Sequence, residues 1–180
     1  MLIDTDRSML LVLDLQEKLL PVIAENERVV GNVVWLVRVA QKLGVPVAAT
    51  EQYPKGLGPT EKSVRELFPD GAIASKNHFS AVAAQVLRTL PGADRAQVVV
   101  AGLEAHVCVV QTTLELLEEG REVYVVADCI GWRHELDARM AFARMQQEGA
   151  RIVTREMVAY EWLGEAGTPR FREIAKEFLR

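Results

Sequence analysis

Short, valine-rich apolar runs recur along the chain and alternate with longer amphipathic stretches, and this alternation restricts the possible folds more than any other feature. Glycine, proline or polar residues bound each run. The runs cover residues 8–15, 45–51, 72–76, 96–103, 121–128 and 150–154. Their apolar character is nearly continuous, as in parallel strands that are covered on both faces. Strands that alternate with helices predict an α/β fold built from right-handed βαβ units.

The stretches between and after these runs have helical periodicity. We predict helices over residues 26–43, 80–90, 106–119, 133–148 and 169–179. In the first of these, Val29, Val33 and Val37 share one face, and Gly44 follows as a favourable C-cap. The expected architecture is a three-layer Rossmann-like sandwich, with a six-stranded, mostly parallel sheet and helices on both of its faces. Residues 1–180 are expected to form a single domain.

The charge balance and the lack of long apolar segments exclude several classes of protein. The formal net charge is −4 at pH 7, which disfavours binding to nucleic acid, because that requires a basic surface. No apolar run approaches the roughly 18 residues that a membrane-spanning helix needs. Asp4 and Asp6 lie where a signal peptide would carry positive charge. We therefore expect a cytoplasmic protein with no membrane or nucleic-acid partner.

Residues 51–62 form the longest irregular stretch of the chain, and they contain two prolines and two glycines. The stretch follows the carboxyl end of a predicted strand, where α/β proteins place binding loops. A lid or specificity loop and a plain surface connection are equally compatible with this pattern. In the first case, Gln52 and Tyr53 would line a substrate pocket.

Polar residues end or follow three of the apolar runs. Asp14 lies in the end of the first run, Lys76 ends the third, and Cys108 follows the fourth at the start of a predicted helix. In a doubly wound sheet these positions lie at the carboxyl edge, where the binding crevice opens. Taken singly, they have ordinary explanations: a turn-forming aspartate, a surface lysine and a buried structural cysteine. Their coincidence predicts an active site, with two of the three strands flanking the crevice.

The three residue types form a coherent catalytic group. A free thiol has a pKa of about 8.5, so little of it is nucleophilic thiolate at neutral pH. The helix start and the Lys76 ammonium are both expected to favour the thiolate of Cys108. Asp14 is placed to accept the thiol proton and later return it to a leaving group. Backbone amides at the helix start are suited to stabilise an oxyanion.

Three segments of the chain resemble the signature segments of the isochorismatase-like cysteine hydrolases, a family that includes nicotinamidases and N-carbamoylsarcosine amidohydrolases. They are DLQ (14–16), SKNHFSA (75–81) and GLEAHVCV (102–109). Three further segments resemble the isochorismatase-domain-containing subgroup, whose substrates are poorly defined. They are TEQYPKGLG (50–58), EVYVVADC (122–129) and TREMVAYEWL (154–163).

The resemblance implies roles for particular residues. It makes Asp14 the general base, Lys76 the family's lysine and Cys108 the nucleophile. It places a cis peptide bond immediately before Glu104, so that the amides of Glu104 and Cys108 would form the oxyanion hole. It also implies that Gln16 shapes the substrate pocket and that the protein forms a homo-oligomer.

Phe79 and His106 are further candidates for substrate contact, together with Gln16, Gln52 and Tyr53. Phe79 follows Lys76 closely in the sequence, and aromatic side chains are common in small-molecule pockets. His106 precedes the candidate nucleophile by two residues, although a solvated histidine at a helix start explains it equally well.

No metal or organic cofactor is expected. Nicotinamidases of this family hold a metal with an aspartate and several histidines after the second strand, whereas residues 51–62 contain no histidine. His78, His106 and His134 do not have the spacing of a metal site. The glycine pattern of NAD- and FAD-binding folds is absent, and so is the G-x-S-x-G motif of serine hydrolases.

The leading hypothesis is a metal-independent hydrolase that cleaves an amide-like C–N bond of a small-molecule substrate through a thioester on Cys108. One alternative is a catalytically silent binding or scaffold member of the family. A second is hydrolysis of a vinyl ether such as isochorismate. A third is a thiol redox sensor in which Cys129 resolves Cys108, but the chain has no CxxC motif, and burial in the core better explains Cys129.

Overall fold

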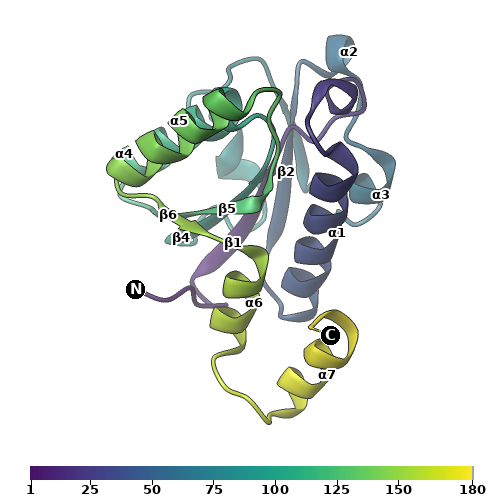
Figure 1. Ribbon diagram of the computed structural model, residues 1–180, viewed down its shortest axis with the longest axis vertical. Helices are drawn as coiled ribbons and strands as arrows, with labels where there is room; N and C mark the ends of the chain where they lie inside the picture. Colours follow the sequence, from purple (N-terminus) through teal and green to yellow (C-terminus); the bar gives the residue numbers. More distant parts are fainter. Residues whose placement is uncertain (180) are drawn as a thin grey trace.

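The computed structural model describes residues 1–179, which fold around a sheet of six parallel strands (Figure 1). The strands follow the order β3-β2-β1-β4-β5-β6, and every neighbouring pair is parallel. Each strand corresponds to one apolar run of the sequence, so the predicted architecture is confirmed. The strands are β1 (Ser8–Leu13), β2 (Val47–Gln52), β3 (Ile73–Lys76), β4 (Gln97–Gly102), β5 (Glu122–Ile130) and β6 (Arg151–Val153).

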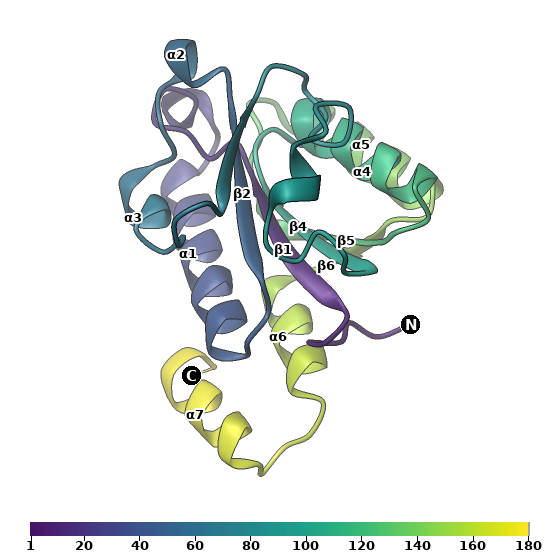
Figure 2. The same cartoon turned by 180° about the vertical axis from the view of Figure 1, so that it is seen from behind.

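Helices cover both faces of the sheet (Figures 1 and 2). One face carries α1 (Asn26–Lys42), α6 (Arg155–Leu163) and α7 (Pro169–Phe178), and the other carries α4 (Val110–Glu118) and α5 (Glu135–Gln147). Two short helices, α2 (Pro54–Leu57) and α3 (Lys62–Arg65), lie between β2 and β3. Short 3-10 helices cover Leu20–Val22 and Val86–Thr89. Within residues 1–179, no helix combines the length and the apolar character that crossing a membrane requires.

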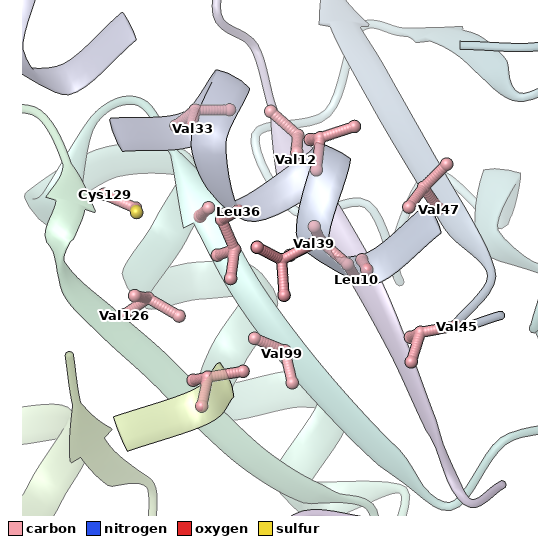
Figure 3. Packing of buried hydrophobic residues seen from close by; sticks show 14 of the residues in the cluster. Leu10, Val12, Val33, Leu36, Val39, Val45, Val47, Val99, Val126 and Cys129 are labelled. Carbon is pink, nitrogen blue, oxygen red and sulfur yellow. The ribbon is translucent and has the colours of Figure 1, made fainter. Parts of the chain in front are cut away.

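Every residue of β1 is buried, because the strand packs against helices on both faces. Leu10 and Val12 belong to the apolar cluster beneath α1, whereas Leu11 and Leu13 belong to a second cluster beneath α4 and α5. Figure 3 shows part of the first cluster, with Leu36 of α1 among the strand side chains. Burial on both faces is the physical reason why these strands are continuous apolar runs in the sequence.

The predicted helix over residues 80–90 is wrong. The segment consists of turns and one short 3-10 helix. Ser80 Oγ donates to Glu115 Oε2 of α4 at 2.6 Å, and the same carboxylate oxygen accepts from a backbone amide of the segment at 2.9 Å. Gln85 adopts a left-handed φ of 57°, which interrupts a helical run. These contacts with α4 determine the local conformation against the helical pattern of the sequence.

Helical periodicity does not predict α6, although its caps are recognisable. Thr154 precedes the helix, and its hydroxyl accepts from the Met157 amide at 3.3 Å. Gly164 follows the helix with a φ of 66°. A threonine N-cap and a glycine at the C-terminal end were therefore the available signals.

Gly102 lies where the fold leaves no room for a side chain. It ends β4 with a φ of 113°, and a Cβ atom there would lie 2.0 Å from the carbonyl oxygen of Leu13. The Leu103 amide donates to the same oxygen at 2.7 Å. Glycine at this position therefore allows the end of β4 to lie directly against the end of β1.

We predict that Gly102→Ala lowers the free energy of unfolding by about 3 kcal/mol or more, because it combines backbone strain with a clash against backbone atoms. Gly149→Ala is the matched control, since Gly149 has a similar φ of 108° and an added Cβ meets nothing within 4 Å. Urea unfolding of both variants measures the difference. Equal losses in the two variants would contradict the steric role of Gly102.

Candidate active site

The three predicted catalytic residues lie around the switch point of the sheet. β1 and β4 are neighbours, yet α1 and α4 cover opposite faces, so the direction of winding reverses between these two strands, and doubly wound sheets bind ligands at such a point. Asp14 directly follows β1, Cys108 follows β4 after a short turn, and Lys76 ends β3 at the sheet edge. Their exposed fractions are 0%, 5% and 4%, respectively. The structure brings them together, since the charges of both Asp14 and Lys76 act on the Cys108 thiol.

Lys76 and Asp14 form a fully buried ion pair, with Lys76 Nζ 2.8 Å from Asp14 Oδ2. The ammonium also donates to Gln52 Oε1 at 2.7 Å and to the Phe79 carbonyl oxygen at 2.9 Å, and the His78 carbonyl oxygen lies at 3.3 Å. An ammonium has three hydrogens, and protein acceptors use all of them. Lys76 therefore acts on the site through its charge rather than through a free donor.

Thr50 holds the second oxygen of the Asp14 carboxylate. Thr50 is fully buried near the end of β2, and its hydroxyl donates to Asp14 Oδ1 at 2.7 Å. The Asp14 amide donates to the Thr50 carbonyl oxygen at 3.0 Å, and Asp14 has a left-handed φ of 52°. Thr50 was not predicted from the sequence. The only signal was a hydroxyl residue near the carboxyl end of an apolar strand beside β1.

The surroundings of Cys108 favour its protonated thiol over the thiolate. Burial raises the pKa of the Cys108 thiol well above its usual range, the Asp14 charge raises this pKa further, and the Lys76 charge opposes both effects. Lys76 thus favours the thiolate, as expected, but burial and the Asp14 charge outweigh its effect on the pKa of Cys108. Cys108 lies in the π-helical turn Ala105–Val109 that precedes α4, a type of distortion that is frequent at functional sites.

A cis peptide bond joins Leu103 and Glu104, as expected from the sequence. The Glu104 carbonyl oxygen accepts from the amides of Val107 and Val109 at 3.0 and 3.2 Å. The Glu104 carboxylate accepts from Arg133 Nε at 2.7 Å, and the sequence analysis missed this arginine. No local sequence pattern predicts the ion pair between Arg133 and Glu104, because it joins the turn after β4 to the loop after β5. The oxyanion hole formed by the Glu104 and Cys108 amides stays a prediction.

Gln16 and Gln52 bind protein groups around the ion pair. Gln16 Nε2 donates to the carbonyl oxygens of Gln52 and Gly58 at 3.0 and 2.7 Å, and Gln16 Oε1 accepts from the Gln52 amide at 2.7 Å. Gln52 Nε2 donates to the Asn77 carbonyl oxygen at 2.7 Å, while its Oε1 accepts from Lys76. Both glutamines therefore brace the site, and their contact with substrate stays a prediction.

The irregular stretch after β2 is a braced connection rather than a free lid. The amides of Glu17 and Lys18 donate to the carbonyl oxygens of Pro59 and Leu57 at 3.1 and 3.3 Å. The Glu61 amide also donates to a carbonyl oxygen of the segment after β1, at 2.8 Å. These bonds tie residues 57–61 to the segment that carries Asp14, which favours the plain surface connection.

The remaining candidates for substrate contact differ in their surroundings. Tyr53 and Phe79 are exposed, and the Phe79 carbonyl helps to hold Lys76. His106 is partly buried, its Nδ1 has no hydrogen-bond partner within residues 1–179, and its Nε2 lies 4.0 Å from Asp137 Oδ2. A cavity of about 280 Å³ next to Lys76 is lined by Ser75, Lys76, Asn77, His78, Ala84 and Val86. A larger groove of about 560 Å³ lies between α1 and α3, away from Cys108. Substrate contact by these residues stays a prediction.

Cys129 lies in the apolar core beneath α1 and not among the candidate catalytic residues. Its side chain is fully buried in the cluster beneath α1, to which Val33 and Val126 also belong (Figure 3). Burial raises the pKa of the Cys129 thiol well above its usual range, and both cysteines are free thiols. These surroundings are those of a core residue and not of a resolving thiol.

Within the described residues, no group of three or more His, Cys, Asp or Glu side chains is arranged to hold a metal ion.

We predict that Lys76→Met lowers the free energy of unfolding by about 3–5 kcal/mol, because it leaves the buried Asp14 carboxylate unpaired. Adding Asp14→Asn should recover part of this loss, since no buried charge then remains. Lys18→Met is the control, because Lys18 is exposed and the bond from its Nζ to the Gly56 carbonyl oxygen, at 3.1 Å, is the side-chain hydrogen bond that it makes within residues 1–179. Urea unfolding provides the values, and a Lys76→Met loss no larger than that of Lys18→Met would disprove the prediction.

Comparison with known proteins finds relatives along most of the chain. A family model described as Isochorismatase domain matches residues 8–157. Isochorismatase domain-containing protein 2 of Danio rerio is 39% identical over 176 residues, which cover 97% of this chain and 88% of that protein.

Solved structures share the fold over nearly their whole length. A structure described as MAR1 ribonuclease from Caenorhabditis elegans has a TM-score of 0.89 and 35% identity, covering 100% of this chain and 93% of that one. The YcaC gene product of Escherichia coli is described as an octameric hydrolase of unknown specificity. It has a TM-score of 0.86 and 27% identity, covering 91% of this chain and 83% of that one. YcaC from Pseudomonas aeruginosa was solved with hexane-2,5-diol and covalent acrylamide. It has a TM-score of 0.88 and 25% identity, covering 99% of this chain and 92% of that one.

Proposed function

The chain belongs to the isochorismatase family, and on that premise we propose that it is a metal-independent cysteine hydrolase that cleaves a small amide-like C–N bond through a thioester on Cys108. The observation that carries the proposal is the fully buried Lys76–Asp14 ion pair beside a nearly buried thiol. A nucleophile, a base and a fixed positive charge at the switch point are the parts that acyl transfer requires.

The acylation step begins with a neutral thiol. Asp14 takes the thiol proton while the sulfur of Cys108 forms a bond to the acyl carbon, and an electron pair of the C=O bond moves to oxygen. The amides of Glu104 and Cys108 stabilise this oxyanion. When the C=O bond re-forms, the C–N bond breaks and Asp14 returns the proton to the leaving nitrogen. The thioester remains on the enzyme.

Deacylation uses the same base. Asp14 takes a proton from a water molecule, whose oxygen attacks the thioester carbon. The bond from carbon to sulfur then breaks, and the sulfur receives the proton held by Asp14, which restores the thiol and releases the acid. Throughout the cycle the Lys76 charge stabilises the ionised form of Asp14, while Thr50 fixes the orientation of the carboxylate.

Relatives support a small-molecule hydrolase. The E. coli relative is described as a hydrolase and as an octamer, and we extend both the reaction class and a homo-oligomeric state to this chain. The P. aeruginosa relative was solved with covalent acrylamide, so a small electrophile bonds covalently to that protein. The C. elegans relative is described as a ribonuclease. A net charge of −4 and a Cys108 that is 5% exposed fit a polyanion poorly, which favours a small molecule.

We predict that Cys108→Ala lowers the kcat for any accepted small amide by about 10³-fold or more while the fold is retained. A panel of small primary and secondary amides, read by amine release and by intact mass for an acyl adduct, provides the measurement. Cys129→Ala is the control and should keep its activity, because Cys129 lies in the core.

The same assay is run with and without a metal chelator, and we expect equal rates. Substantial turnover in Cys108→Ala would disprove the covalent mechanism. An active wild-type protein that loses its activity in the chelator would disprove metal independence.

A further inference from the structure

Glu104 places a carboxylate in the turn whose amides are proposed to receive the oxyanion. The residue separates β4 from the π-helical turn that carries Cys108. Only 10% of its side chain is exposed. A negative charge in this turn opposes the developing oxyanion, because charge interactions are strong where water is excluded. The proposed reaction therefore requires that the Glu104 charge be cancelled.

Arg133 supplies the opposite charge. Its Nε donates to Glu104 Oε2 at 2.7 Å, although 44% of the Arg133 side chain is exposed. Two backbone hydrogen bonds, both of 3.0 Å, fix the loop that carries Arg133 against the turn. The Ala105 amide donates to the Gly131 carbonyl oxygen, and the Gly131 amide donates to the Gly102 carbonyl oxygen. These backbone bonds fix the two segments that carry Arg133 and Glu104 relative to each other, so the ion pair does not depend on side-chain contact alone.

We propose that Arg133 is a positioning residue for acyl transfer and that it acts through Glu104. The guanidinium cancels the carboxylate charge and fixes its orientation, so that the amides of Glu104 and Cys108 meet the oxyanion without an opposing anion in the same turn. The inference rests on the proposed function. It assigns a role to an ion pair that the chemistry of Asp14, Lys76 and Cys108 does not itself use.

Two probes separate the oxyanion from the reactivity of the thiol. p-Nitrophenyl acetate acetylates Cys108: sulfur bonds to the acyl carbon, the carbonyl electron pair moves to oxygen, and collapse expels p-nitrophenolate and leaves the thioester. Iodoacetamide alkylates the same sulfur at a saturated carbon, expels iodide and forms no oxyanion. In both reactions Asp14 takes the thiol proton. The ratio of acetylation to alkylation rate constants, at one pH, therefore reports stabilisation of the oxyanion.

Arg133→Met is expected to lower this ratio about tenfold, because it leaves the Glu104 charge uncancelled. Arg133→Lys should lose less, since it keeps the charge. The addition of Glu104→Gln to Arg133→Met should restore the ratio toward that of the wild type, because the uncancelled carboxylate is then removed. If Arg133→Met fails to fold by circular dichroism, Arg133→Gln is used in its place.

Arg7→Met is the matched control. Arg7 is also 44% exposed, and its Nη2 lies 2.7 Å from Glu122 Oε1. The pair lies beside the amino-terminal ends of β1 and β5, at the opposite edge of the sheet from Cys108. Its loss should leave the ratio unchanged.

Three outcomes would overturn the inference. An unchanged ratio in Arg133→Met would remove the role altogether. A lowered ratio that Glu104→Gln does not restore would show that Arg133 acts on the probe or on the fold and not through Glu104. A comparable loss in Arg7→Met would show a general effect of surface charge.

Peptide mapping after each reaction separates this inference from the proposed function. Acetylation of wild-type Cys108 with a ratio that the variants leave unchanged overturns the inference alone. If p-nitrophenyl acetate labels the protein elsewhere but not at Cys108, and Cys108→Ala reacts as fast as the wild type, the proposed function fails and the inference fails with it.

Discussion

The buried ion pair between Lys76 and Asp14 is the constraint on which the rest of the site depends. Two charges removed from water are costly unless their hydrogen-bonding groups are satisfied, and replacing such a pair with apolar residues is often neutral or stabilising. Gln52, the Phe79 carbonyl and Thr50 satisfy the groups of this pair, and Gln16 in turn fixes Gln52. Because the pair needs so many hydrogen-bonding partners, a gain in folding stability does not explain why it is present. Its position beside the Cys108 thiol supports the catalytic role that we propose for it.

The parallel fold itself brings Asp14, Lys76 and Cys108 together. Parallel strands covered on both faces bring polar residues at their carboxyl ends to one edge, and the winding changes direction there, between β1 and β4. Gly102 lets the two strand ends lie in contact, and the π-helical turn then places Cys108 next to Asp14. Burial and the neighbouring carboxylate raise the pKa of the Cys108 thiol. In the mechanism that we propose, deprotonation by Asp14 and attack on the acyl carbon are therefore coupled, and the base matters as much as the nucleophile.

Sequence alone predicted the strands and the central residues because both depend on local pattern. Continuous apolar runs identify strands that are buried on both faces, and a polar residue at the end of such a run identifies the edge where Asp14, Lys76 and Cys108 meet. Thr50 and Arg133 escaped prediction because their partners lie 36 and 29 residues away, across neighbouring strands and turns. The segment at residues 80–90 was misassigned for the same reason, since Glu115 of α4 binds it. The protonation state of Cys108 depends on burial, which no local pattern contains.

The ultraviolet absorbance of the Cys108 thiolate, measured against pH as the difference between the wild type and Cys108→Ser, tests the central claim most directly. Burial and the Asp14 charge raise the pKa of this thiol, so the account predicts a protonated Cys108 throughout neutral pH and ionisation only above the usual range of cysteine. Asp14→Asn should lower this pKa, because it removes the negative charge and leaves that of Lys76. A thiolate already present at neutral pH in the wild type, or a pKa that Asp14→Asn leaves unchanged, would contradict the account.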